Sequence, residues 1–194
     1  EYLLCAQERQ MEILRRNAIG MDIEYSEVTD EVAAISFQGP CTCAILKNMG
    51  FKDVETMKMF DVRYFDFPGG EIMISRTGYT GDLGYEIWMD PNDALSVWDI
   101  LIDKGKTFGI TPTGLHALDI ARIEAGLILL DVDYISTRHA LIESRKSSPY
   151  ELGLGWAVKL KKRNFIAKDL MSRKYKPRVI KPKKGKGSFK RKKC

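Results

Sequence analysis

Three glycines fall within seven residues, 78–84, directly before a short segment in which polar and apolar side chains alternate. Glycine tolerates left-handed backbone conformations, so this stretch predicts a tight loop that a planar ligand can approach closely. Alternation over 85–89 places Glu86 and Trp88 on the strand face opposite to Ile87. Because burying an unpaired carboxylate is costly, Glu86 is the first candidate binding residue. The alternatives are a strand-edge glutamate in water and an ion pair with an internal arginine.

The rest of the chain mixes helical and strand patterns in the way of an α+β domain. Helical spacing, Pro or cap residues at the start and Gly at the end predict helices over 8–17, 40–49, 93–104 and 111–125, the last capped by Thr111-Pro112-Thr113. Strand patterns and turn residues predict strands over 21–27, 32–37, 62–67, 71–75 and 85–89, with Pro68-Gly69-Gly70 turning a hairpin, and the apolar run at 2–6 predicts one more strand. No regular βαβ rhythm occurs, which disfavours a dinucleotide-binding fold.

Charge divides the chain into two unlike regions. Twelve of the 31 Lys and Arg residues, and no acidic residue, lie in 172–194, which leaves 19 basic against all 26 acidic residues in 1–171. A segment with so few apolar residues cannot offset its ordering entropy by burial, so we expect a folded region over 1–171 and a basic disordered tail over 172–194. The tail would bind nucleic acid or acidic surfaces by counterion release, or would be a solvated end or part of a truncated frame.

The cysteine and histidine content argues against a disulfide scaffold and a metal site. Four cysteines are too few for the former, and the C-x-C of Cys41 and Cys43 is too short for a zinc knuckle, so we expect them to be small packing residues. His116 and His139 are too isolated for a metal site or a triad. No stretch approaches the roughly 20 apolar residues of a membrane span. These features favour a cytoplasmic protein, or one of the mitochondrial matrix in a eukaryote.

Four segments together resemble one protein family. Residues 75–87 resemble the R-T-G-Y-T-G-E-x-G-[FY]-E-I signature of the glycine cleavage T-proteins and their relatives, the sarcosine and dimethylglycine oxidases and folate-dependent demethylases. Residues 35–40 are similar to the family's A-x-x-x-Q-G-P corner, and 114–126 to its G-L-x-A-R-D-x-L-R-L-E-A-G helix. Residues 148–158 and 164–166 resemble its P-x-E-x-G-L-G-W-x-V and D-F-I-G segments. The order of the motifs is that of the family, from about residue 2 to residue 171.

The resemblance implies a T-protein-like folate-binding fold over 1–171, with mixed, mainly antiparallel sheets and packed helices, in one or two subdomains and without the family's C-terminal barrel domain. It implies an aminomethyltransferase that moves a one-carbon unit from an aminomethyl or methylated donor to tetrahydrofolate. The implied partner is a small-molecule donor or a lipoylated carrier protein. A non-catalytic folate-binding module and a folate-dependent demethylase are the alternatives.

Three residues match folate-contacting positions of the family. The glutamate matching Glu86 holds the pterin ring, whose 2-amino-4-oxo edge presents two parallel N–H donors to a carboxylate. Tyr79 matches a residue in the loop over the ring, where its aromatic face can stack, and loop packing is the alternative. Trp156 matches a tryptophan near the bound folate, and a buried core position is the alternative.

Arg122 matches an arginine that reaches into the folate channel of the family. A helical projection places it near Leu115 and Leu118, which predicts that it points inward. An inward arginine requires an anion or several carbonyls, and Asp119 is an alternative partner to a ligand.

The family's catalytic carboxylate is an aspartate that precedes the part of the chain seen here, so the catalytic residue is unknown. The apolar run at 2–6 reads as a strand entered part-way, and we expect a segment before it. Departures from the family are Leu118 in place of an arginine, Leu130 in place of a tyrosine, and Cys5-Ala6-Gln7 where T-proteins usually carry an asparagine. These departures support the superfamily better than the T-protein itself.

Overall fold

The computed structural model describes residues 3–160, and the chain divides into two compact units, Glu1–Ile128 and Leu129–Cys194. The predicted basic tail at 172–194, the boundary at 171 and the motif at 164–166 lie outside the described residues. Within 3–160 no helix has both the length and the apolar character needed to cross a membrane.

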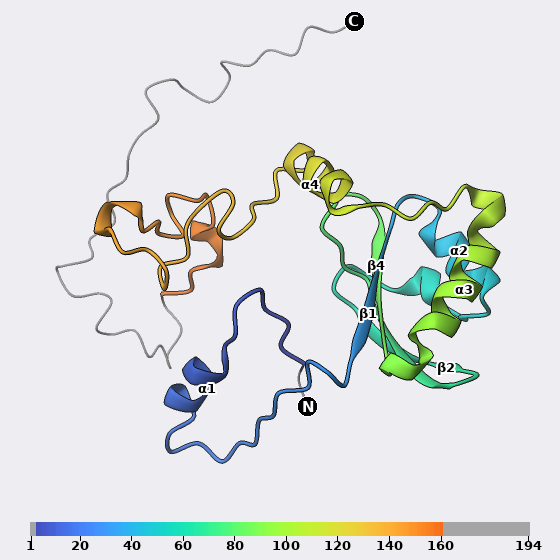
Figure 1. Cartoon of the computed structure of the whole chain (residues 1–194), viewed down its shortest axis with the longest axis horizontal. Helices are drawn as coiled ribbons and strands as arrows, with labels where there is room; N and C mark the ends of the chain where they lie inside the picture. Colours follow the sequence, from blue (N-terminus) through green and yellow to red (C-terminus); the bar gives the residue numbers. More distant parts are fainter. Residues whose placement is uncertain (1–2, 161–194) are drawn as a thin grey trace, which may run out of the picture. The chain divides into compact units, whose positions relative to one another are not determined.

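A four-stranded antiparallel sheet forms the centre of the first unit (Figure 1). Its strands are β1 (Ala33–Gln38), β2 (Val62–Phe67), β3 (Gly70–Ser75) and β4 (Gly84–Met89). Their order across the sheet is β1-β4-β3-β2, so β4 is an interior strand with a neighbour on each side. The predicted strands at 32–37, 62–67, 71–75 and 85–89 are confirmed to within one residue, as is the hairpin between β2 and β3.

Four α-helices and five short 3-10 helices complete the elements of residues 3–160. The α-helices are α1 (Met11–Asn17), α2 (Thr42–Asn48), α3 (Ala94–Gly105) and α4 (Leu115–Glu124). The 3-10 helices are η1 (Val54–Thr56), η2 (Pro91–Asp93), η3 (Lys106–Phe108), η4 (Glu143–Arg145) and η5 (Gly155–Ala157). The Asp90 side chain accepts the backbone N–H of Asn92 at 2.8 Å and caps η2, whereas α3 follows Asp93 without a side-chain cap.

Several sequence predictions at the borders of the fold are wrong. Residues 3–6 and 21–27 were expected to be strands but contain none, because neither an apolar run nor alternation supplies a neighbouring strand to complete the backbone hydrogen bonds. The helix expected from residue 8 begins at Met11. The helix expected to be capped by Thr111-Pro112-Thr113 begins after Gly114, whose extended backbone serves as the cap without a side-chain hydrogen bond.

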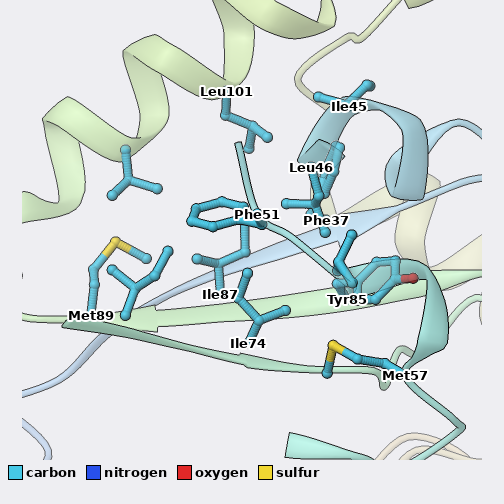
Figure 2. Packing of buried hydrophobic residues seen from close by; sticks show 13 residues of the cluster. Phe37, Ile45, Leu46, Phe51, Met57, Ile74, Tyr85, Ile87, Met89 and Leu101 are labelled. Carbon is cyan, nitrogen blue, oxygen red and sulfur yellow. The ribbon is translucent and has the colours of Figure 1, made fainter. Parts of the chain in front are cut away.

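The core lies on one face of the sheet, under α2 and α3 (Figure 2). The face is apolar because alternate strand residues point the same way, and the buried side chains interlock with those of the two helices. The sheet contributes Phe37, Ile72, Ile74, Tyr85, Ile87 and Met89, and the helices contribute Ile45, Leu46, Val97 and Leu101. The other face therefore carries Glu86 and Trp88, as the alternation predicted.

Truncating the core residue Leu46 should destabilise the protein strongly. Leu46 of α2 is 0% exposed and Leu95 of α3 is 78% exposed. Leu46→Ala should lower the free energy of unfolding by about 2–5 kcal/mol through lost burial and a residual cavity. The matched control Leu95→Ala should change it by less than about 0.5 kcal/mol. Urea unfolding followed by circular dichroism measures both values, and equal effects would contradict this core assignment.

Tyr85 gives the core a dependence on alkaline pH. Burial, and then a hydrogen bond with the half-buried Cys43 thiol, raise the pKa of Tyr85 to about 12. An unfolded tyrosine titrates near pH 10, so folding favours the neutral phenol. The contribution is complete below about pH 10 and is lost as the pH rises through about 12.

Tyr85→Phe should therefore flatten part of the alkaline loss of stability. Between pH 10 and 12 its free energy of unfolding should fall less steeply than that of the wild type, because the variant has no phenol to ionise. Urea unfolding at several pH values measures the two slopes. Parallel curves would show that the Tyr85 hydroxyl titrates alike in the folded and unfolded chains.

Candidate functional site

Glu86 lies in the middle of the open sheet face. It is half-buried on the interior strand β4, opposite Ser75 of β3 and Ser36 of β1 in the strand register. The Ser75 hydroxyl donates to Glu86 Oε2 at 3.3 Å, and within residues 3–160 no ion pair joins Glu86 to an arginine. Both alternatives for this carboxylate, a strand-edge position and an arginine pair, are therefore wrong.

Gln38, at the end of β1, holds the glycine-rich loop against the sheet. Its Nε2 donates to the carbonyls of Thr77 at 3.4 Å and Tyr85 at 3.2 Å. Its Oε1 accepts from the Thr80 hydroxyl at 3.4 Å. One side-chain amide thus joins both ends of the loop and its middle, so the loop that borders Glu86 is tied to two strands.

Two of the three loop glycines make room for this amide. A Cβ atom at Gly78 or Gly84 would lie 1.9 or 1.8 Å from Gln38 Oε1, so only glycine permits the observed approach. Of the three, only Gly81 has a positive φ, +74°. Sequence reasoning assigned the glycines to backbone freedom and missed Gln38. The available signal was the Gln38-Gly39-Pro40 corner in the same chain as a loop with unexplained glycines.

The outer part of the loop rests on the end of α4. A Cβ at Gly81 would lie 2.4 Å from Ala125 Cβ, and the Tyr79 hydroxyl donates to the carbonyl of Ile128. Tyr79 is half-buried, so loop packing describes its hydroxyl, and stacking of its ring on a ligand stays a prediction. The loop is held from two sides, by Gln38 and by the segment after α4.

Arg122 is buried, as its helical projection predicted, with 2% of its side chain exposed. Its Nε and Nη2 lie 2.8 and 2.7 Å from Asp119 Oδ1, and its Nη1 donates to the Leu127 carbonyl at 3.1 Å. The alternative that Asp119 pairs with it is confirmed. The predicted grouping with Leu115 is wrong, since Leu115 is exposed. Arg122 fixes residue 127, directly before the carbonyl that receives the Tyr79 hydroxyl.

Trp156 belongs to the second unit, in η5. Its side chain is 74% exposed, so the alternative of a buried core tryptophan is wrong. Its backbone carbonyl accepts from Lys159 Nζ at 3.1 Å. The ring offers an open aromatic face, and its contact with a folate stays a prediction.

The glycine loop at 78–84 and Glu86 on β4 both lie in residues 75–87, the segment that resembles the glycine cleavage T-protein signature. The family model described as the GCVT N-terminal domain matches residues 2–162. The chain belongs to the GCVT N-terminal domain family. The resemblance to glycine cleavage T-proteins is thereby confirmed, as is the α+β fold class with an antiparallel sheet.

Relatives of this GCVT domain are aminomethyltransferases. The enzyme of Halothermothrix orenii is 37% identical over 140 residues, which cover 72% of this chain and 37% of the enzyme. That of Bacillus subtilis is 36% identical over 167 residues, or 85% of this chain and 43% of the enzyme. The crystal structure of glycine cleavage system aminomethyltransferase T from Bartonella henselae superposes with a TM-score of 0.58 at 26% identity, over 78% of this chain and 37% of that one. The chain spans about two fifths of these curated relatives.

In the glycine loop at 78–84, the effects of substitutions at Gly84 and Gln38 on the free energy of unfolding should be strongly coupled. Gly84→Ala forces the amide out of its place and should lower the free energy of unfolding by about 1–3 kcal/mol, because three hydrogen bonds are lost. In a Gln38→Ala background the same change should cost less than about 0.5 kcal/mol, because the obstructing atom is gone. Urea unfolding of the four proteins measures the cycle.

Gly114→Ala is the control for this cycle. A Cβ there meets no atom within 4 Å, so its effect should be the same with and without Gln38. Additive effects of Gly84→Ala and Gln38→Ala would contradict the role given to the amide.

Proposed function

We propose that this domain binds a reduced folate through Glu86 and serves the transfer of a one-carbon unit from an aminomethyl donor to tetrahydrofolate, as in glycine cleavage. The observation that carries the proposal is a half-buried carboxylate on an interior strand whose protein partner is a neutral hydroxyl. Such a group attracts ligands that present N–H donors, because its charge is not compensated by a cation. Aminomethyltransferase relatives over more than two thirds of the chain support the reaction class.

The donor pattern around Glu86 fits a pterin edge. Ser75 donates to Oε2, and Oε1 takes part in no hydrogen bond with residues 3–160. Each carboxylate oxygen accepts more than one hydrogen bond, so both oxygens keep capacity for a ligand. Two parallel N–H donors, as on a 2-amino-4-oxo pyrimidine edge, complement this arrangement.

The remaining residues of the site act by position. The loop that borders Glu86 is held by Gln38 on one side and by Tyr79 on the other, which limits the entropy lost when a ligand is bound. Tyr79 is proposed to offer its ring to the pterin, and Arg122 to hold residues 119–127 as part of the wall of the site. Trp156, which belongs to the second unit, is proposed separately to offer its exposed ring to a folate.

Tetrahydrofolate, when bound, supplies the amine that accepts the one-carbon unit. We assign no catalytic acid or base among residues 3–160, so the proposed work of this region is binding and orientation. A lipoylated carrier protein or a small methylated amine is the proposed donor. A non-catalytic folate-binding module is the second candidate, because the carboxylate of Glu86 would serve binding in either case.

Glu86→Gln should weaken folate binding. The amide keeps the size of the side chain but replaces one acceptor with a donor, so the Kd for 5-formyltetrahydrofolate should rise about 10-fold or more. The control Glu71→Gln changes an exposed carboxylate of β3 and should leave the Kd unchanged. Isothermal titration calorimetry on the full-length protein that carries this sequence measures all three values.

Two outcomes separate the candidates. A wild-type protein that does not bind 5-formyltetrahydrofolate would overturn both. Binding without formation of methylenetetrahydrofolate from an aminomethylated carrier, or of methyltetrahydrofolate from a methylated amine, would favour the binding module over the transferase.

A further inference from the structure

A chain of donors runs across the open sheet face and ends on Glu86. Trp88 Nε1 donates to Ser75 Oγ at 3.3 Å, and Ser75 Oγ donates to Glu86 Oε2, also at 3.3 Å. Ser75 is the last residue of β3 and is only 6% exposed. Glu86 and Trp88 are alternate residues of β4 on the same face, so the serine hydroxyl lies between them.

The chemistry of the three groups fixes the direction of this chain. An indole N–H donates and never accepts, so Trp88 uses an acceptor site of the serine oxygen. The single hydrogen of the Ser75 hydroxyl is then available to Glu86 Oε2. A carboxylate accepts this bond, and its other oxygen stays accessible for a ligand. The chain therefore sets both the orientation and the accepting role of Glu86.

Both distances, 3.3 Å, are longer than the usual ranges of about 2.5–3.0 Å for O–H···O and about 2.7–3.2 Å for N–H···O hydrogen bonds. The two hydrogen bonds are therefore weak, and a ligand that orders the carboxylate can shorten them. The Trp88 N–H is bonded to Ser75, and Ser75 is bonded to Glu86. A ligand that moves the Glu86 carboxylate therefore changes the surroundings of the indole.

On this basis, and resting on the folate binding proposed above, we infer that Ser75 is a positioning residue for Glu86 and that Trp88 is a built-in reporter of ligand binding at that carboxylate. Ser75 directs Oε2 and leaves Oε1 to meet the ligand. Trp88 directs Ser75. The ligand need not contact Ser75 or Trp88 to change the surroundings of the indole.

Ser36 provides a matched control on the opposite side of Glu86. It lies on β1 directly across from Glu86 in the strand register, as Ser75 does on β3. Ser36 is exposed, and no hydrogen bond joins it to Glu86 in the described chain. Ser75→Ala removes the hydrogen bond to Glu86, whereas Ser36→Ala removes only a neighbouring hydroxyl. The comparison therefore isolates the effect of the hydrogen bond.

The test compares Ser75→Ala, Ser75→Thr and Ser36→Ala by calorimetric titration of the full-length protein with 5-formyltetrahydrofolate. Ser75→Ala should raise the Kd about 5- to 20-fold, as expected for the loss of a hydrogen bond to a charged group. Ser75→Thr keeps the hydroxyl and should stay within about 3-fold of the wild type, and Ser36→Ala within about 2-fold. Trp88→Phe leaves Ser75 without its donor and should raise the Kd about 2- to 5-fold, whether or not the threonine variant folds.

Fluorescence supplies the readout that a merely structural role would not move. The contribution of Trp88 to the change in tryptophan emission on saturation with 5-formyltetrahydrofolate is measured as the difference between each protein and its Trp88→Phe counterpart. This contribution should be strongly reduced in Ser75→Ala but kept in Ser36→Ala, whatever Trp98 and Trp156 contribute. A Ser75→Ala protein with unchanged Kd and unchanged emission response would overturn the inference while Glu86→Gln still weakens binding. A wild-type protein without folate binding would instead overturn the proposed function itself.

Discussion

The insertion of the Gln38 amide between Gly78 and Gly84 is the contact on which the architecture of the site depends. It joins the end of β1 to a loop about 40 residues later and reaches the carbonyl of Tyr85 at the start of β4. A side-chain amide has a fixed number of donors and acceptors, and in the half-buried Gln38 both kinds are used. The loop that borders Glu86 is therefore held by directional bonds, which restrict its position more than apolar contacts would.

The orientation of the Glu86 side chain follows from the packing of the opposite face of β4. The core face of β4 places Tyr85 and Ile87 under α2 and α3, and this burial fixes the register of the strand between β1 and β3. Once the register is fixed, Glu86 has no choice of face and meets Ser75 as its neighbour. Packing of the apolar core thus sets the orientation of Glu86, a polar residue on the opposite face of the sheet.

Sequence patterns succeeded where a short-range rule decides the structure. Alternation identified all four strands of the sheet and the outward face of Glu86, and the helical projection predicted that Arg122 points inward. The same rule failed at residues 21–27, where alternation is present but no neighbouring strand is, and for Leu115, which the projection grouped with a buried arginine although it is exposed. A period describes which residues share a face, and it does not state whether that face is covered.

The sequence by itself determined the period, the turns and the family, because these depend on residues that are close along the chain or on motifs that are recognised as they stand. Only the tertiary structure decided which group each polar atom meets: Gln38 with the glycine loop, Arg122 with Asp119 and the Leu127 carbonyl, Glu86 with Ser75. The physical reason is that a hydrogen bond requires two atoms within about 3 Å of each other. The strand register brings residues as far apart as Gln38 and Thr77 to that distance, and no local pattern encodes it.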